Sequence, residues 1–262
     1  IGRNKDGSIY RKAGTQEYYD AIKVVSDWMI ADGMHTCVDE YNNLIGTIPG
    51  TDPDAKPIVV GSHIDTVPTG GKYDGVLGVL GGMEAAKRLK GITKHPIQVV
   101  AFYDEEDSMS GSIGFTQSKS VYDIKTFLEL HVEQGPVLDK RGADIGVVEG
   151  IVGQRRCKFV ITGQENHAGT TPMDMRDDAL VKASELVSYV YHRASIYDGL
   201  VATVGKLDVS PNLFSIIPGR VDLTVQIRDL DTSNIIRFAS DVASKFDLIY
   251  ETDYESTPAL CD

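Results

Sequence analysis

The amino-acid sequence predicts an α/β protein with two domains, each indicated by a different pattern of apolar residues. In the first half of the 262 residues, helical and strand patterns alternate, which favours a mostly parallel sheet flanked by helices. From about residue 153 the predicted order becomes β-α-β-β-α-β, the ferredoxin-like pattern of an α+β domain. We therefore predict a first domain over residues 1–150, a second over 151–253, and a return to the first over 254–262.

The elements of the first domain follow from the spacing of apolar residues. A helix that ends at Gly33 is indicated by the spacing of Tyr18, Ile22, Val25 and Trp28. Strands are predicted near residues 43–48, at 58–63 and at 97–103. A helix between the last two strands has an apolar face formed by Val79, Met83, Ala86 and Leu89. This βαβ order predicts that the two strands around it run parallel.

The second domain is predicted from alternation within its strands and from helical spacing between them. Strands are expected at residues 157–162, 200–208 and 221–228, and a last strand begins near Leu248. A helix over residues 177–195 is expected to face inward with Leu180, Ala183, Val187 and Val190. Thr232 can cap a second helix, which carries the apolar residues Ile235, Phe238, Val242 and Phe246.

Composition and charge narrow the range of partners. The formal net charge of −12 and the pI near 4.9 disfavour nucleic acid and anionic membranes, whose phosphates would repel the protein. No apolar run approaches the ~20 residues that span a bilayer, and the sequence does not begin with a charged-then-apolar leader. Cys37, Cys157 and Cys261 are few, odd in number and far apart, so we expect reduced thiols in a cytoplasmic protein and no cysteine metal site.

Three segments place imidazole and carboxylate groups where apolar stretches end. They are Gly61-Ser-His-Ile-Asp-Thr66, the acidic run Asp104-Glu-Glu-Asp107, and Glu129-Leu-His-Val-Glu-Gln-Gly135. In open α/β sheets the carboxyl ends of the strands are where ligands bind. Imidazole and carboxylate groups that reach one crevice from separate strands suit a divalent metal. The sequence therefore predicts a metal site at this edge of the first sheet.

Two residue pairs in these segments have spacings that matter for chemistry. His63 and Asp65 lie two apart at a strand end, so both side chains point to the same side. We interpret His63 as a metal ligand and Asp65 as the acceptor that fixes its tautomer; the alternative is a histidine that only bonds to a neighbouring carboxylate. Glu105 and Glu106 are adjacent, so their side chains diverge and can take different roles. The alternative for this pair is a solvated acidic turn.

Longer motifs extend over nearly the whole chain. They are GSHIDTVPTGGKYDG at 61–75, the EE pair at 105–106, LHVEQGP at 130–136, VGQRR at 152–156, NHAGTTPMDMR at 166–176, and PN followed by IPG and an arginine from residue 211. This series resembles the M20 metallopeptidase superfamily, and most of all its amidohydrolase branch. That branch includes N-carbamoyl-L-amino-acid hydrolases, allantoate amidohydrolases and β-ureidopropionases. The resemblance implies a metal-binding α/β domain and an inserted α+β lid used for dimerisation.

The resemblance also implies the ligands of two divalent ions, Zn²⁺ or Mn²⁺, which are His63, Asp74, Glu106 and His131. Asp74 is the implied bridging carboxylate, although by itself it would be interpreted as an ordinary turn residue before a glycine. His131 matches the next ligand, and its weak alternative is a core histidine beside Leu128 and Leu130. Glu105 is the implied general base for the attacking water, and Asp65 supports the site beside it.

Four further residues are implied to contact the substrate, namely Gln134, His167, Asn212 and Arg228. His167 would stabilise the oxyanion from the lid of the partner subunit. Arg228 would pair with the substrate carboxylate, a planar contact suited to a guanidinium group. Without the resemblance, Arg228 could equally be a surface residue of its strand.

The sequence departs from the family pattern in three places. Similar enzymes take a further metal-binding histidine from a segment beyond the lid, and no residue up to Asp262 matches it. The stretch between Glu106 and His131 is shorter than in the family by several tens of residues, and Asp107 stands where the family usually has glycine. We therefore expect either a partial sequence, continued by a histidine-bearing catalytic segment, or a shortened relative.

The function expected from this resemblance is that of a binuclear-metal amidohydrolase. It would cleave the ureido or amide C–N bond of an N-carbamoyl amino acid or an allantoate-like acid. One alternative is an M20 exopeptidase or N-acyl-amino-acid deacylase, and another is a non-catalytic shortened relative that keeps the lid. We also expect a homodimer through residues 153–252, because the strands at 157–162 and 200–208 carry few of the charges that protect exposed sheet edges.

Overall fold

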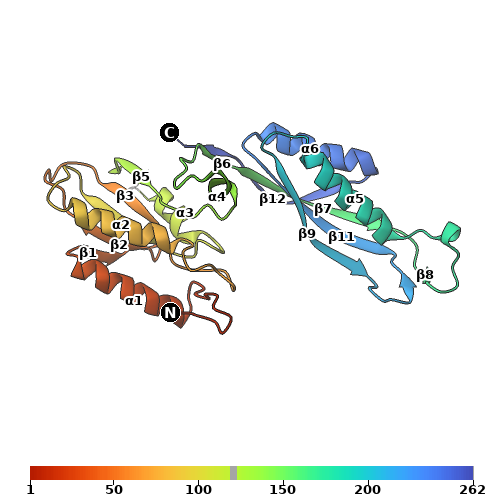
Figure 1. Ribbon diagram of the computed structural model, residues 1–262, viewed down its shortest axis with the longest axis horizontal. Helices are drawn as coiled ribbons and strands as arrows, with labels where there is room; N and C mark the ends of the chain where they lie inside the picture. The colour runs from red at the N-terminus through yellow and green to blue at the C-terminus, as the bar shows by residue number, and fades with distance from the viewer. Residues whose placement is uncertain (119–122, 262) are drawn as a thin grey trace. The chain divides into compact units, whose positions relative to one another are not determined.

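The structure is a computed structural model that describes residues 1–118 and 123–261 (Figure 1). The chain divides into two compact units, Ile1–Asp144 and Ile145–Asp262, close to the boundary expected near residue 150. Residues 254–261, which we expected to return to the first domain, belong to the second unit. There the strand Ala259–Leu260 (β13) pairs with Gly150–Ile151 (β6).

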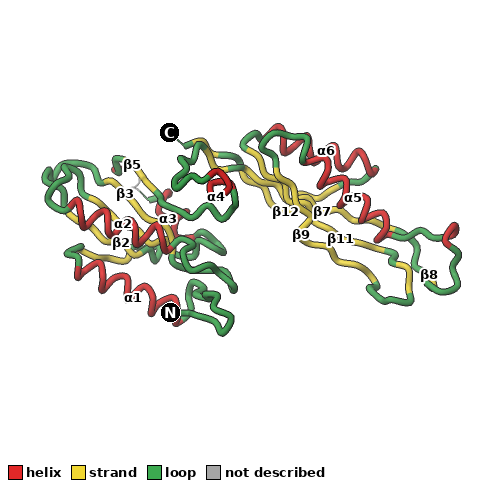
Figure 2. Tube along the Cα trace, viewed as in Figure 1, coloured by secondary structure: helices red, strands yellow, loops and turns green. Residues whose placement is uncertain are grey.

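The first unit contains a five-stranded sheet with helices (Figure 2). Its elements are α1 (Gln16–Ala31), β1 (His35–Val38), β2 (Leu44–Ile48), β3 (Ile58–His63), α2 (Val76–Leu89), β4 (Ile97–Phe102), α3 (Ser110–Gln117), β5 (Thr126–Leu128) and α4 (Val137–Arg141). The sequence analysis did not predict β1, α3, β5 or α4. These elements are short, and their apolar patterns are too brief to be distinguished from loop.

The sheet is mixed, with the strand order β1-β2-β4-β3-β5. β3 pairs with β4 and β5 in parallel, but β2 pairs with β1 and β4 antiparallel. The expectation of a mostly parallel sheet therefore describes only the half around β3. The reason is that β1 and β2 are joined by the short loop 39–43, and a parallel connection needs a crossover of a dozen or more residues.

Helices α1 and α2 pack on the sheet through one face each. The buried residues of α1 are Tyr18, Ala21, Val25 and Met29, so the buried face is rotated from the predicted one. Trp28 is 52% exposed, and Leu89 at the end of α2 is exposed as well. The spacing of apolar residues predicted the helix correctly. It could not show which of two neighbouring apolar residues, Trp28 or Met29, faces the sheet.

The second unit follows the order β-α-β-β-α-β, with short strands added. Its main elements are β7 (Gly153–Thr162), α5 (Ala179–Ala194), β9 (Val201–Ser210), β11 (Arg220–Asp229), α6 (Thr232–Phe246) and β12 (Tyr250–Ser256). β8 (Asn166–His167) pairs with β10 (Ile216–Ile217), and a 3₁₀ turn covers Met173–Met175. The main sheet is antiparallel throughout, in the order β12-β7-β11-β9.

One face of this sheet is covered by α5 and α6 (Figure 1), and the core lies between the sheet and these two helices. Alternate residues of β7 and β11 supply it, namely Cys157, Phe159, Ile161, Val221, Leu223, Val225 and Ile227. Burial raises the pKa of the Cys157 thiol to about 12, so this cysteine is an unreactive packing residue.

Two details of the helices differ from the prediction. In α5 the inward residues include Ala179, Ala183, Leu186 and Val190, whereas Leu180 is 38% exposed and Val187 only packs at the margin. The cap of α6 is Asp231, whose carboxylate accepts from the backbone N–H of Ser233, and Thr232 is the first helical residue. Asp is as good a cap as Thr, so the two neighbouring candidates could not be separated by residue type. Among the described residues, no helix is long and apolar enough to cross a membrane.

Candidate metal centre

His63, Asp74 and His131 come together at the carboxyl ends of the parallel strands. His63 is the last residue of β3, Asp74 precedes α2, and His131 follows β5. One potential ligand atom from each lies within 4.8 Å of the other two. Nε2 of His131 is 3.4 Å from Oδ1 of Asp74, and Nε2 of His63 is 4.0 Å from the same oxygen. A cation between the three groups would contact all of them.

Both imidazole rings are oriented by acceptors behind them. Nδ1 of His63 lies 3.1 Å from the carbonyl oxygen of Asp65, and Nδ1 of His131 lies 2.9 Å from that of Val132. A carbonyl can only accept, so each Nδ1 carries a proton and each Nε2 is the atom left for a ligand. This arrangement of a ring nitrogen bonded to a backbone carbonyl is typical of metal-binding histidines.

Asp65 connects the histidine strand to the acidic loop. Its Oδ1 is 3.5 Å from Nδ1 of His63, and its Oδ2 accepts from the backbone N–H of Glu106 at 3.0 Å. Burial acts to raise the pKa of Asp65, but these hydrogen bonds outweigh it and hold the pKa below its ordinary value. Asp65 is therefore a buried carboxylate that contacts both His63 and the acidic loop, and its supporting role stays a prediction.

Glu105 and Glu106 lie beside the three-residue group. Oε2 of Glu105 is 3.5 Å from Nε2 of His63, and the Glu105 side chain is 40% exposed. Burial raises the pKa of both glutamates above the ordinary value. Glu106 is not part of the group of three, although its Oε1 is buried without a hydrogen-bond partner. The roles of base for Glu105 and ligand for Glu106 stay predictions.

The charge of the cluster suits a cation. Burial acts to lower the pKa of His63, but the carboxylates of Asp65 and Glu105 outweigh it and raise the pKa to about 9. Oδ1 of Asp74 and Oε1 of Glu106 are both buried without hydrogen-bond partners, which is costly unless another group satisfies them. A divalent cation held by the group of three would satisfy Oδ1 of Asp74 and displace the proton from His63. The residues present thus fit a metal ion.

Glycine at two positions allows α2 to approach the histidine strand closely. Gly75 has φ of +64°, and a Cβ there would lie 2.5 Å from Nε2 of His63. A Cβ on Gly78 would lie 2.3 Å from the carbonyl oxygen of Leu130. Because neither position has a side chain, the loop with Asp74 and the segment with His131 both reach His63.

The acidic loop is fixed by Asn43, which sequence analysis missed. This residue is fully buried, and its Oδ1 accepts from the N–H of Tyr103 at 3.0 Å while its Nδ2 donates to the carbonyl of Gly111 at 3.0 Å. Asn43 thus holds both ends of the loop that carries Glu105. A single asparagine before a strand gives no sequence signal for this role, because its partners are about 60 residues away.

Gln134, predicted to contact the substrate, donates from Nε2 to Oδ2 of Asp74 at 2.7 Å. Its backbone is left-handed, with φ of 55°, three residues after His131. The side chain therefore borders the metal group and positions the carboxylate that both histidines face. Its contact with a substrate stays a prediction.

The other predicted substrate residues are exposed in the second unit. His167 lies in β8, and its Nδ1 accepts from the N–H of Gly169 at 3.0 Å, so the proton lies on Nε2. Asn212 has φ of 57° in the loop after β9. Nη2 of Arg228, on the open face of β11, donates to Oε1 of Gln226 at 3.2 Å. A donor at Nε2 of His167 is what oxyanion stabilisation requires.

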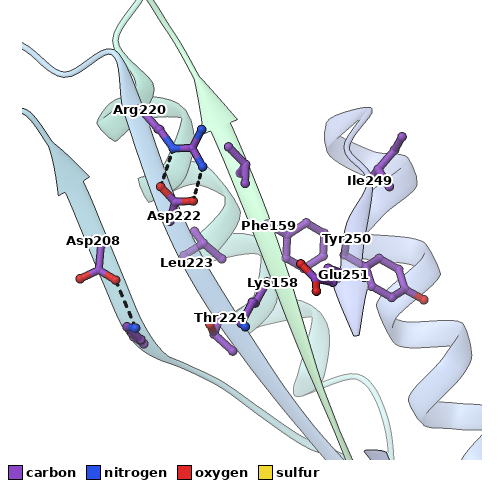
Figure 3. A pocket seen from close by; sticks show the side chains of 12 residues that line it. Lys158, Phe159, Asp208, Arg220, Asp222, Leu223, Thr224, Ile249, Tyr250 and Glu251 are labelled. Carbon is purple, nitrogen blue, oxygen red and sulfur yellow. Dashed lines mark hydrogen bonds and ion pairs between the residues drawn. The ribbon is translucent and has the colours of Figure 1, made fainter. Parts of the chain in front are cut away.

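A pocket of about 600 Å³ lies on the second sheet (Figure 3). In it Arg220 donates to both carboxylate oxygens of Asp222, at 2.7 and 2.6 Å, and Lys206 lies 3.5 Å from Asp208 (Figure 3). These ion pairs satisfy one another, and none of the predicted site residues lines the pocket.

Residues 59–259 match the Peptidase family M20/M25/M40. The chain belongs to this family. It is 34% identical over 299 aligned residues to an N-carbamoyl-L-amino-acid amidohydrolase from Pseudomonas sp. (strain NS671), covering 96% of this chain and 72% of the relative. It is 35% identical to an allantoate amidohydrolase from Bacillus subtilis (strain 168), covering 93% of this chain and 69% of the relative.

Solved structures give the same result for this M20 chain. The crystal structure of an amidase of the hydantoinase/carbamoylase family from Burkholderia multivorans matches with a TM-score of 0.86 and 32% identity. The match covers 100% of this chain and 76% of that one. The predicted membership of the amidohydrolase branch is therefore confirmed, and the chain is that of a metal-dependent hydrolase acting on C–N bonds.

The curated relatives are longer than this M20 chain, which spans 66–72% of the first three of them. The alignment with the Pseudomonas relative has 299 positions, more than the 262 residues here, so that relative has segments with no counterpart in this chain. The stretch from Glu106 to His131, predicted to be short, includes residues 119–122, which lie outside the described residues.

Proposed function

We propose that the protein hydrolyses the ureido or amide C–N bond of an N-carbamoyl amino acid or an allantoate-like acid, releasing ammonia. The observation that carries this proposal is the group of His63, Asp74 and His131, with Glu105 beside it. Relatives named as N-carbamoyl-amino-acid and allantoate amidohydrolases support the ureido substrate over a peptide. The three widely spaced cysteines support a reducing, cytoplasmic location.

In this proposal His63, Asp74, His131 and Glu106 hold two divalent ions, Zn²⁺ or Mn²⁺. When bound, such ions polarise the substrate carbonyl and make water a stronger acid. Glu105 takes the proton of the attacking water and passes it to the leaving nitrogen. The raised pKa of Glu105 supports this role, because it makes the carboxylate a stronger base toward the proton of the attacking water.

Three exposed residues of the second unit, together with Gln134 of the first, bind the acid in this proposal. Arg228 pairs with the substrate carboxylate, and Asn212 and Gln134 contribute amide hydrogen bonds. His167 donates from Nε2 to the oxygen that becomes negatively charged. The hydrogen bond from Gly169 to Nδ1 supports this, because it keeps the ring in the tautomer that can donate there.

The assay that tests the function compares substrate classes. With metal-loaded protein, we expect N-carbamoyl amino acids or allantoate to yield ammonia, detected by a coupled enzymatic assay, and dipeptides and N-acetyl amino acids to react at least ~10-fold more slowly. Turnover of dipeptides or N-acyl amino acids without ammonia release would support the exopeptidase or deacylase alternative. Stoichiometric metal without turnover of any substrate would indicate a non-catalytic relative.

A homodimer through residues 153–252 completes the proposal. The strand at 157–162 was expected to lie at an edge of the sheet, but the corresponding β7 lies between β12 and β11. The strand at 200–208 corresponds to β9, which is an edge strand as predicted. Val181 and Tyr191 of α5 are exposed, whereas Tyr189 packs against Phe246. An open strand edge and apolar residues on an adjacent helix favour a two-fold contact in which each subunit uses the same surface.

Mixed dimers test whether His167 acts on the partner's metal site. His167→Ala and Glu105→Gln subunits should each be nearly inactive alone, and mixing them should restore part of the activity. Restoration is expected because some mixed dimers contain one site with intact Glu105 and intact His167. The measurement is ammonia release after mixing, with molecular mass from light scattering. A fully active monomer, or no gain on mixing despite confirmed exchange of subunits, would contradict the proposal.

A further inference from the structure

Arg11 is a buried cation beside the metal group. It is only 7% exposed, although arginine is seldom buried without a specific partner. Its Nε donates to the carbonyl oxygen of Ile64 at 2.7 Å. Ile64 lies between His63 and Asp65, so this hydrogen bond acts on the peptide that joins the predicted ligand to its orienting carboxylate.

The hydrogen bond replaces a sheet contact at the point where β3 ends. The pairing of β3 with β4 stops at His63 and Phe102, so beyond this point the neighbouring strand no longer fixes the backbone. The carbonyl of Ile64 would be a buried acceptor without a partner there if Arg11 were absent. A charged donor makes a stronger hydrogen bond than a neutral one, which suits a position that must be held rigidly.

The backbone around Arg11 is tied to the same loop. Its N–H donates to Oγ1 of Thr66 at 2.8 Å, and its carbonyl accepts from the N–H of Thr66 at 3.2 Å. Ile9 and Gly70 exchange two backbone hydrogen bonds, at 3.1 and 2.9 Å. The segment 9–11 thus runs beside the loop 64–70 that leads to Asp74. The backbone of Arg11 is therefore fixed by Thr66, and its side chain is fixed by the carbonyl of Ile64.

The charge of Arg11 also complements the cluster. Burial lowers the pKa of the guanidinium, and the carboxylate of Asp65 acts in the opposite direction. The buried charge of Arg11 therefore has an opposite charge in the same part of the site, while its hydrogen bond to Ile64 supplies the geometry.

We propose that Arg11 is a positioning residue, which fixes the Ile64 peptide so that His63 and Asp65 are set for metal binding. It acts through the backbone and touches neither metal nor substrate. Only the expected effect of Arg11 on turnover rests on the proposed function. Its effect on metal affinity is independent of which substrate the enzyme uses.

The test measures Zn²⁺ binding to the metal-free protein by isothermal titration calorimetry. Arg11→Met should weaken Zn²⁺ binding roughly 10–100-fold, as expected for loss of a group that orients a ligand. Addition of free guanidinium at low millimolar concentration should restore part of the affinity. Arg3→Met is the matched control, because Arg3 is exposed in the same N-terminal segment and should bind Zn²⁺ as the unmodified protein does.

Arg11→Lys provides a second variant in case Arg11→Met does not fold. Lysine keeps the charge but lacks the planar Nε–H, so we expect a folded protein with Zn²⁺ affinity reduced at least ~5-fold. Where turnover can be measured, kcat should fall more than KM rises, since the substrate residues are unchanged. Zn²⁺ affinity within twofold of the unmodified protein in a folded Arg11→Lys variant would overturn the proposal. Zn²⁺ binding that depends on Arg11 without any hydrolysis would instead contradict only the proposed function.

Discussion

His63→Ala is expected to abolish both metal binding and hydrolysis. Nε2 of His63 faces Asp74, and the ring is fixed by Asp65 and by the close approach of Gly75. Removal of the imidazole leaves Asp74 and His131 as the remaining members of the group, too few to retain a divalent ion against dialysis. The measurement is elemental analysis of dialysed protein, together with an assay of ammonia release.

The matched control for this change is His35→Ala, since His35 is an exposed residue of β1. It should keep the metal content and the activity of the unmodified protein. Circular dichroism of both variants checks that the fold is retained. Normal metal stoichiometry in folded His63→Ala would show that His63 is not a ligand and would refute the assignment of the site.

Glu105→Gln is expected to retain the metal and to lose at least ~10²-fold in kcat, which is the size of effect typical of removing a general base. Gln has nearly the same shape as Glu but cannot accept a proton at neutral pH. Because Glu105 lies beside the group of three rather than within it, metal affinity should change little. Single-turnover kinetics and metal analysis on the same preparation separate the two effects.

Two neighbours in the acidic loop serve as comparisons. Asp107→Asn removes a charge that pairs with Lys12 at the surface, and it should leave kcat within about twofold because such exposed pairs contribute little. Glu106→Gln should lower metal content, since Glu106 is the proposed ligand. Loss of metal in Glu105→Gln with retention in Glu106→Gln would reverse the roles of the two glutamates.

Most of the second unit could be predicted from sequence because its patterns are local. Alternation of apolar and polar residues in 221–228 defines a strand with one buried face, and the structure buries Val221, Leu223, Val225 and Ile227. The ends of helices were less certain. Asp231 and Thr232 are both good caps, and the choice between them depends on the residue at which the preceding strand ends.

The sequence by itself predicted the candidate site residues, since imidazole and carboxylate groups at the ends of strands can be identified without coordinates. It also determined the family, through motifs that extend over both units. The tertiary structure alone decided the mixed pairing of the first sheet and the rotation of α1 that leaves Trp28 exposed. It also decided the two supports of the site, Arg11 and Asn43. Their hydrogen bonds join segments more than 50 residues apart, and a contact of that separation leaves no periodic pattern in the chain.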